Sequence, residues 1–269
     1  MEIEICDSPV IIIGSPRSGT TVLAWALDQH PELVAFGESQ ILVELFGTGN
    51  LGRNYNREGK SSFLRRHGID QQQFLADVGL GFNRLFTRAA GGKRWVDQTP
   101  YHTLMLPWLA GMFPGAKFIH ILRDGRRVVH SMINKTAHFG VKGPKWSEDF
   151  EAACRTWVQY SKTATAFEAS NPDRCVTVRN EDLVQDPEPG FRRMLSFLGL
   201  PYDPATAAFF ATNRINSSFG HNSPGVGAVD TLTEPWTQWD EPHKRVFIDI
   251  AKETMVSYGI ADADELVLP

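Results

Sequence analysis

The chain has 269 residues, a formal net charge of −4 at pH 7, 42% hydrophobic and 22% charged residues, which is the balance of an ordinary globular protein. This length suits one large domain with a sizeable core, and the mixed charge excludes a basic, nucleic-acid-binding surface over the whole chain. Cys6, Cys154 and Cys175 lack the spacing of metal or redox motifs, so we expect a reducing compartment and no disulfide framework. The first residues are acidic and no apolar run is long enough to span a membrane. We therefore expect a soluble, cytoplasmic protein without a signal peptide.

The first predicted strand leads into a glycine-rich loop. Residues 10–13 are a short β-branched run, typical of a buried parallel strand. Gly14 and Gly19 follow with the G-x-x-x-x-G spacing of a nucleotide P-loop, but Thr20 stands where that motif requires lysine. The positive charge lies inside the loop instead, on Arg17. This pattern predicts a phosphate cradle for a nucleotide, without ATP hydrolysis.

The start of the next helix explains why such a loop would bind an anion. The first N–H groups of a helix lack partners within the helix, and its dipole places partial positive charge there. Glycines let the preceding backbone curl around the anion. The candidate binding residues are Ser15, Pro16, Arg17, Ser18, Gly19, Thr20 and Thr21. A tight strand-to-helix turn with a solvated arginine is the alternative.

Strands alternate with helices along the rest of the chain. Apolar runs predict strands at 94–97, 117–122 and 174–179, and apolar periodicity predicts helices at 21–30, 71–89, 124–135, 147–169, 188–198 and 241–258. Thr99 as N-cap and Pro100 predict a further helix towards Phe113, with a break at Pro107.

This order predicts an α/β protein: a P-loop-type three-layer fold with a central parallel sheet flanked by helices, as a single domain over 1–269. Ligands then bind beyond the carboxyl ends of the strands, where the glycine loop lies. We expect the polar, glycine-rich stretches 47–68 and 216–235 to be mobile. The apolar face of the helix at 147–169 predicts a packed core rather than a cofactor site.

A second informative segment follows the strand at 117–122. Arg123 stands at the carboxyl end of that strand, on the same edge as the glycine loop. Ser131 lies about two helical turns later and Lys135 one turn beyond it, on one helix face. These three residues are candidates to enclose a second anion. We expect the neighbouring Arg126 and Arg127 to pair with carboxylates nearby.

Both segments resemble motifs of one enzyme family. Pro16-Arg-Ser-Gly-Thr-Thr21 resembles the 5′-phosphosulfate-binding loop of sulfotransferases that use 3′-phosphoadenosine 5′-phosphosulfate (PAPS). Leu122-Arg-Asp-Gly-Arg-Arg-Val-Val-His-Ser131 resembles their 3′-phosphate-binding segment, in which the first arginine and the final serine hold the ribose 3′-phosphate. The resemblance covers about residues 8–200 and includes the segments 95–100, 113–119 and 181–187. It is nearest to bacterial members and to the tyrosylprotein and carbohydrate sulfotransferase branch.

The resemblance implies transfer of a sulfuryl group from PAPS to a hydroxyl acceptor, with 3′,5′-bisphosphoadenosine (PAP) as product and no metal ion. The acceptor could be a sugar, a phenol or tyrosine, or another small alcohol. Arg17 and the loop N–H groups would face the negative charge that develops on the leaving oxygen. Ser217 and Ser218 are candidate donor contacts in a closing loop, with an ordinary surface loop as the alternative.

A base must accept the proton of the acceptor hydroxyl. Glu38 lies where the tyrosylprotein branch and related bacterial members carry a catalytic glutamate. His102 is the second candidate, because other branches use histidine. Asp97 is a candidate acceptor contact or orienting partner, and we interpret His120, inside an apolar strand, as a core histidine.

Two departures from the family pattern affect this interpretation. Gln98 stands where many relatives carry lysine, so either Arg17 acts alone or Lys93 or Arg94 supplies the charge. Asn180 stands where relatives often carry tyrosine, and Arg179 is the candidate to fill that space.

Three other functions remain open from the sequence: a P-loop nucleotide kinase, a catalytically silent regulator that binds PAP or PAPS, and a structural scaffold. The missing Lys-Ser/Thr argues against the kinase. Acceptor contacts would come from 39–68 and 136–147, which do not identify the acceptor. The sequence indicates no nucleic-acid partner and leaves a homodimer open.

Overall fold

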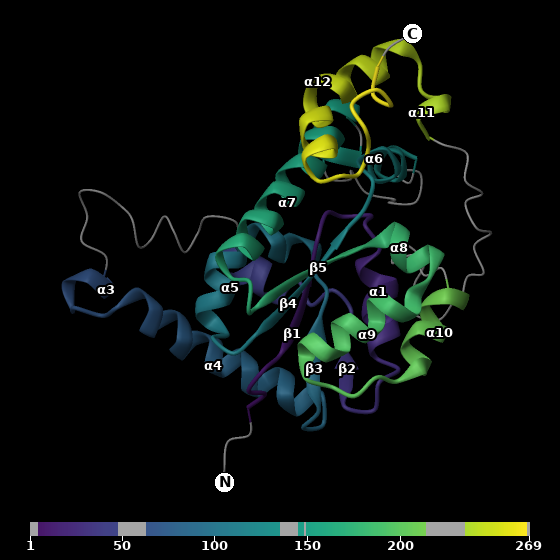
Figure 1. Ribbon diagram of the computed structural model, residues 1–269. Coiled ribbons are helices and arrows are strands. Elements are labelled where there is room, and N and C mark those ends of the chain that lie inside the picture. Colours follow the sequence, from purple (N-terminus) through teal and green to yellow (C-terminus); the bar gives the residue numbers. More distant parts are fainter. Residues whose placement is uncertain (1–4, 48–62, 135–144, 148, 214–234, 268–269) are drawn as a thin grey trace.

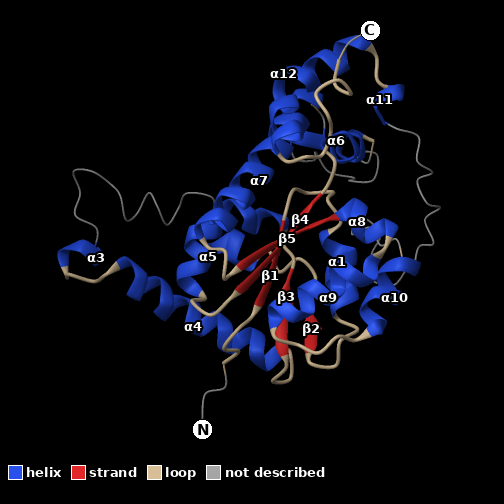
Figure 2. Cartoon of the chain, viewed as in Figure 1, coloured by secondary structure: helices blue, strands red, loops and turns tan. Residues whose placement is uncertain are grey.

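The computed structural model describes residues 5–47, 63–134, 145–147, 149–213 and 235–267. Its centre is a five-stranded sheet in the order β2-β3-β1-β4-β5, with every neighbouring pair parallel (Figures 1 and 2). The strands are β1 (Val10–Ile13), β2 (Leu33–Ala35), β3 (Arg94–Asp97), β4 (Lys117–Leu122) and β5 (Cys175–Arg179). Because β1 lies between β3 and β4, the connection from β1 to β2 and the connection from β3 to β4 run in opposite directions across the sheet. Ligands of α/β folds bind at such a switch in strand order.

Helices cover both faces of the sheet. They are α1 (Thr20–Leu27), α3 (Phe63–Arg66), α4 (Gln71–Ala89), α5 (Leu106–Met112), α6 (Gly125–Ile133), α7 (Phe150–Ser170), α8 (Asn180–Gln185), α9 (Pro187–Leu198), α10 (Pro204–Thr212), α11 (Pro235–Gln238) and α12 (Glu241–Ser257), with 3₁₀ turns η1 (Pro100–Met105) and η3 (Lys145–Ser147). Residues 41–47 are also helical. The described part of the chain contains no helix with the length and apolarity needed to cross a membrane.

Alternate residues of β1 enter two separate cores. Val10 and Ile12 pack with α1, α9 and α10, whereas Ile11 and Ile13 pack with α4, α5 and the end of α7. All four are at most 1% exposed. Burial of each such side chain contributes about 1.5–3 kcal/mol, which explains why a strand of four residues can stand at the centre of the sheet.

A third core lies beyond the carboxyl edge of the sheet, where α6 and α12 pack on the first half of α7 (Figure 1). Cys154 and Trp157 of α7 are fully buried in it, while Ala164 and Phe167 belong to the core that contains Ile11 and Ile13. The prediction that this helix face is core is therefore confirmed.

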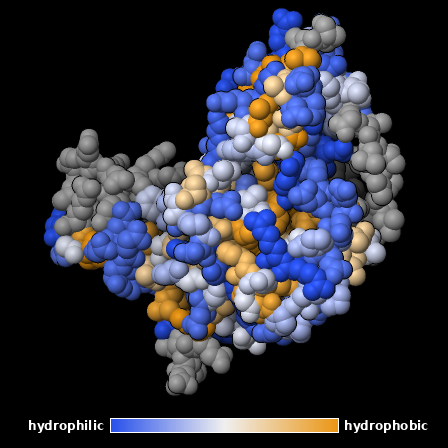
Figure 3. All heavy atoms as spheres, viewed as in Figure 1, coloured by the Kyte–Doolittle hydropathy of each residue, from blue (hydrophilic) through white to orange (hydrophobic). Residues whose placement is uncertain are grey.

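On the face of the molecule in view, apolar residues form small groups among hydrophilic ones (Figure 3).

Most predicted elements agree with the structure, and the differences have local causes. The strands at 94–97 and 117–122 and the helix at 71–89 have the predicted bounds. The sequence reading missed β2, α8 and α10. The break expected at Pro107 falls earlier, between η1 and α5, since proline fits the first turn of a new helix. The stretches 47–68 and 216–235 lie largely outside the described residues, although 63–66 are helical.

His120 is a core histidine, as predicted, and it gives a test of stability. Its Nδ1 lies 2.9 Å from the Thr177 hydroxyl, which donates to Glu168, and burial lowers the pKa of His120 to about 4. An unfolded histidine has a pKa of about 6.5. Between these values the unfolded chain binds a proton that the folded chain does not, so the free energy of unfolding decreases as pH falls, by up to about 1.4 kcal/mol per unit.

We expect urea unfolding across pH 6.5 to 4 to show this loss in the wild type and a shallower loss in His120→Asn. The asparagine amide can still donate to Thr177 but does not titrate. Parallel curves for the two proteins would show that His120 does not carry the pH dependence.

Candidate functional site

The two predicted anion-binding segments meet at the carboxyl edge of the sheet. We call residues 15–21 the first anion loop and residues 123–131 the second anion segment. The first follows β1 and the second follows β4, and these strands are adjacent and parallel. The carboxyl ends of β3 and β5 flank them, so four strand ends contribute to one site.

The first anion loop is curled by its backbone. Gly14 has φ +154° and a Cβ there would lie 2.7 Å from the Ile121 carbonyl oxygen, so no other residue fits without a shift. Both backbone groups of Gly14 bond the buried Thr103 hydroxyl, at 2.9 and 3.1 Å. Arg17 and Gly19 have left-handed φ values of 73° and 100°. A left-handed arginine is uncommon and indicates that surrounding contacts hold this conformation.

Direct hydrogen bonds join the first anion loop to the second anion segment. Arg17 Nε donates to Ser131 Oγ at 3.2 Å, and an Arg123 guanidinium nitrogen donates to the Arg17 carbonyl at 2.8 Å. Burial, with the nearby charge of Arg123, lowers the pKa of Arg17 to about 10, and Glu38 opposes this shift. Arg17 therefore stays charged at neutral pH, and together with the neighbouring guanidinium of Arg123 it favours an anion between the two segments.

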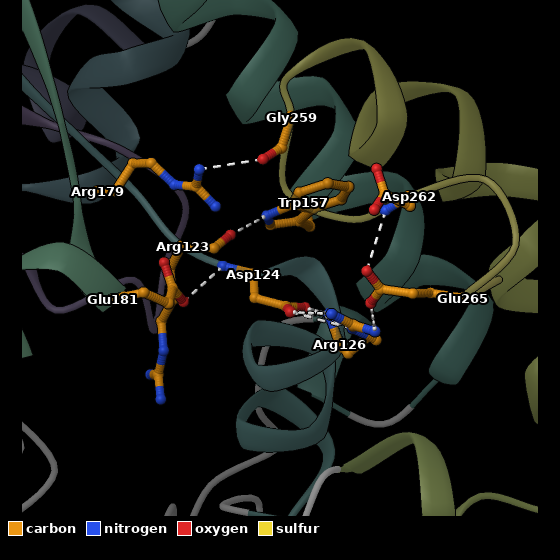
Figure 4. Close-up of polar contacts among 9 residues, drawn as sticks. All are labelled: Arg123, Asp124, Arg126, Trp157, Arg179, Glu181, Gly259, Asp262 and Glu265. Carbon is orange, nitrogen blue, oxygen red and sulfur yellow. Dashed lines mark hydrogen bonds and ion pairs between the residues drawn. The ribbon is translucent and has the colours of Figure 1, made fainter. Parts of the chain in front are cut away.

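The turn that presents Arg123 is held from three sides (Figure 4). Trp157 donates its indole N–H to the Arg123 carbonyl at 3.1 Å. Asp124 caps α6 by accepting from the Arg126 backbone N–H at 2.7 Å, and its carboxylate pairs with the Arg126 guanidinium at 2.6 Å. Arg126 also lies 3.4 Å from Glu265 near the C-terminus. The expected pairing of Arg126 with carboxylates is confirmed.

Three titratable residues, Glu38, Asp97 and His102, lie close to one another near the first anion loop. The Glu38 carboxylate is exposed and accepts from Gln40 Nε2 at 2.8 Å. The pKa of Glu38 is raised, mainly because surrounding protein removes part of its hydration and also because of the charge of Asp97. Asp97 and His102 are both buried, and Asp97 Oδ1 lies 2.9 Å from His102 Nδ1. Burial would raise the pKa of Asp97, but the charge and hydrogen bond of His102 hold it below its ordinary value. Asp97 is therefore the contact partner of the His102 ring.

A short hydrogen-bonded path connects the Glu38 segment to the end of β3. The Ser39 N–H donates to the Thr99 hydroxyl at 3.0 Å, and the Thr99 N–H donates to Asp97 at 2.9 Å. Thr99 stands at the predicted N-cap position, but its hydroxyl accepts from Ser39 instead of capping η1. This path joins residues that are 60 positions apart in the sequence.

The structure corrects the three substitutes suggested for the two family departures. Arg94 lies at the amino end of β3 and donates to the Leu198 carbonyl and to Ser8, so neither it nor the preceding, exposed Lys93 replaces a lysine at position 98. Gln98 itself is buried and its Oε1 lies 3.5 Å from the Thr21 hydroxyl. Arg179 donates to the Gly259 carbonyl at 3.0 Å, away from the tyrosine position that it was expected to fill (Figure 4).

Some predicted site residues lie outside the described residues: Lys135, Ser217 and Ser218. Among the residues that are described, no group of three His, Cys, Asp or Glu side chains could hold a metal ion. The sequence reading missed Thr103, Trp157 and Glu181 as supports of the anion segments. Only Glu181 carried a signal, because it opens one of the segments that resemble the family.

Comparisons with known proteins agree with this geometry. The chain matches the family model described as "Sulfotransferase family" over residues 9–204. It is 31% identical over 195 residues to a putative protein-tyrosine sulfotransferase of Caenorhabditis briggsae, which covers 72% of this chain and 66% of that protein. Protein-tyrosine sulfotransferase 1 of Danio rerio is 29% identical over 216 residues, or 74% of this chain and 55% of that protein. The chain thus spans less than two-thirds of the length of these relatives.

The fold has the same arrangement as solved sulfotransferases. The crystal structure of a mouse sulfotransferase complexed with PAP superposes with a TM-score of 0.56 at 13% identity, over 97% of this chain and 87% of that chain. At this level of identity the likeness concerns the fold.

Proposed function

Because the chain belongs to the sulfotransferase family, we propose that it transfers a sulfuryl group from PAPS to a hydroxyl acceptor. The observation that carries the proposal is the joining of the two anion segments by Arg17, Arg123 and Ser131. PAPS carries anionic groups on both its 5′ and 3′ oxygens, whereas ATP carries a single polyphosphate at the 5′ position. A site with two neighbouring cationic segments and no P-loop lysine matches the former charge pattern.

The first anion loop takes the 5′-phosphosulfate in this proposal. The N-cap of α1 is Gly19, whose backbone leaves the first helical N–H groups without a capping side chain. Arg17 adds a guanidinium from the same loop. The second anion segment takes the 3′-phosphate through Arg123 and Ser131, and Lys135, Ser217 and Ser218 remain candidate donor contacts.

Transfer needs three changes at the reacting atoms. The acceptor oxygen forms a bond to sulfur, the bond from sulfur to the 5′-phosphate oxygen breaks, and the acceptor proton passes to a base. Negative charge grows on the leaving phosphate oxygen, where Arg17 stabilises it. PAP and the sulfated acceptor are the products, so atoms and charge balance without a further reactant.

Glu38 is the base favoured by the geometry. Glu38 is exposed, while His102 is 1% exposed and contacts Asp97. The raised pKa of Glu38 also makes it a stronger proton acceptor than an ordinary glutamate.

The relatives indicate a class of acceptor rather than one particular acceptor molecule. Protein-tyrosine sulfotransferases are similar to this chain over most of its length, which favours a phenolic hydroxyl, as in tyrosine, over a sugar hydroxyl. A screen with ³⁵S-labelled PAPS tests this order by comparing tyrosine peptides, simple phenols and sugars. Transfer to any of these hydroxyls supports the proposal, whereas PAP binding without transfer to any of them would support the silent regulator instead.

The second anion segment gives a binding prediction. Arg123→Ala is expected to weaken PAP binding by about tenfold to a hundredfold while AMP affinity changes little, because charge-assisted phosphate contacts contribute about 1.5–3 kcal/mol. Calorimetric titration of both nucleotides into both proteins measures this. Arg155→Ala, an exposed arginine of α7 that pairs with Glu151 outside both anion segments, is the matched control. Equal losses for PAP and AMP would remove Arg123 from a 3′-phosphate site.

A further inference from the structure

Two consecutive residues at the junction of β5 and α8 each contact one of the anion segments. Asn180 Nδ2 donates to the Ser18 carbonyl of the first anion loop at 3.2 Å. Glu181 Oε1 accepts from the Asp124 backbone N–H at 3.0 Å, next to Arg123 in the second anion segment (Figure 4). The side chains of two adjacent residues at the end of β5 therefore contact both segments.

The contact with the first anion loop is close. Asn180 is 9% exposed, and a Cβ on Gly19 would lie 2.6 Å from Asn180 Nδ2. The glycine and the asparagine thus fit together, with no room for a side chain at position 19. The Ser18 carbonyl accepts this hydrogen bond from Asn180. Removal of the donor would leave a buried carbonyl without that hydrogen bond, which destabilises the loop.

The contact with the second anion segment places a carboxylate beside a cationic site. Glu181 is half-buried, and burial raises its pKa, while the Asp124 N–H and the charge of Arg123 oppose the shift. The bond from Asp124 fixes the residue that follows Arg123. Glu181 therefore contacts the second anion segment through the backbone N–H of Asp124, the neighbour of Arg123.

The junction itself is well anchored. β5 pairs with β4 up to Leu122 and Arg179, and Leu183 of α8 is buried in the core with α9. Adjacent Cα atoms are about 3.8 Å apart across a trans peptide, so Asn180 and Glu181 cannot move independently by much. Residues on such a junction can set a distance more accurately than residues on a loop.

We propose that Asn180 and Glu181 are positioning residues that fix the spacing between the two anion segments, and that this spacing selects nucleotides with both a 5′ and a 3′ phosphate. The proposal rests on the proposed function, because it assigns the two segments to the two phosphates of PAP. Asn180 supports the 5′ side and Glu181 the 3′ side. The residue that departs from the family tyrosine therefore has a role in this chain that does not require contact with the nucleotide.

The test uses three nucleotides and calorimetry, with displacement titrations for weak ligands. Asn180→Ala is expected to lower the affinity for PAP and AMP by about fivefold to tenfold and to leave adenosine 3′-monophosphate unchanged. Glu181→Ala is expected to lower the affinity for PAP and adenosine 3′-monophosphate by a similar factor and to leave AMP unchanged. A loss of general stability would instead affect all three nucleotides alike.

Further variants separate positioning from folding. Asn180→Leu removes the donor at nearly constant volume and should reproduce the effect of Asn180→Ala if that variant folds poorly. Glu181→Gln keeps an acceptor oxygen and should restore binding of adenosine 3′-monophosphate to the wild-type level. Asp182→Ala, on the exposed side of the same helix turn, is the control and should change none of the affinities.

The outcomes distinguish the two proposals. If the wild type prefers PAP but both variants weaken all three nucleotides equally, or none of them, the positioning role is wrong and the proposed function stands. If the wild type binds PAP no more tightly than AMP, the proposed function fails and the positioning proposal fails with it.

Discussion

Glu38→Gln is expected to slow sulfuryl transfer by about a hundredfold or more while PAP affinity stays within about twofold of the wild type. Glutamine nearly preserves the shape of the side chain and its contact with Gln40, but it cannot accept the proton of the acceptor. The rate of transfer from labelled PAPS, measured at saturating acceptor, gives the effect. Single-turnover conditions keep product release from masking the chemical step.

A matched control and a pH profile complete this test. Glu44→Gln, on an exposed glutamate in the helical residues 41–47, should leave the rate unchanged. Since a base must be deprotonated and the pKa of Glu38 is raised, the rate should fall with acid at a pH above the ordinary glutamate value of 4.5. Near-normal turnover of Glu38→Gln would eliminate Glu38 as the base and favour His102.

Arg17→Ala is expected to reduce the transfer rate by about a hundredfold to a thousandfold and PAP affinity much less. Its guanidinium lies between the two segments, and Gln98 brings no positive charge to the opposite side of the loop. Arg17 must therefore stabilise more of the leaving-group charge than an arginine assisted by a lysine. Comparing the single-turnover rate with the calorimetric affinity separates the two effects.

Two substitutions sharpen the result for Arg17. Arg17→Lys retains the charge and should recover part of the rate, whereas the loss of planar two-nitrogen contact keeps it below the wild type. Gln98→Lys introduces the residue that many relatives carry and should reduce the penalty of Arg17→Ala. A large loss of PAP affinity with unchanged turnover in Arg17→Ala would show that Arg17 serves binding alone.

The positions of the anion segments could be predicted because their residues carry strong local signals. Gly14 and Gly19 mark the turn after β1, and Arg123 directly follows an apolar strand. Parallel strands place these ends at one edge, and the chemistry of phosphate recognition then limits the choices. The same reasoning cannot give the bond between Arg17 and Ser131, which depends on side-chain directions after folding.

Several elements were missed because their local signals are weak. β2 has only three residues and begins two positions after Pro31, so its sequence resembles a turn, and it forms a strand through pairing with β3. α8 begins at Asn180, directly after the last residue of β5, and its first residues were interpreted as a motif rather than as a helix. In both cases tertiary contacts decide the structure, and a single sequence does not show them.

The sequence alone also does not identify the residues that hold the anion segments in place. Trp157 has the spacing of a core residue and is one, yet its indole N–H also holds the Arg123 carbonyl. Arg94 was a plausible substitute for a missing lysine until the strand direction placed it at the opposite end of β3. Arg94 is the first residue of β3 and Asp97 is the last, so about 10 Å of extended chain separates the two.

Calorimetric titration of the full chain with PAP, AMP and ATP tests whether the two anion segments form one site for a 3′,5′-bisphosphorylated nucleotide. We expect PAP to bind at least about tenfold more tightly than AMP and ATP, because only PAP can occupy both anion segments. Binding of PAP that is no tighter than that of AMP would contradict the assignment of Arg123 and Ser131 to a second phosphate, and preferential binding of ATP would indicate a nucleotide kinase instead.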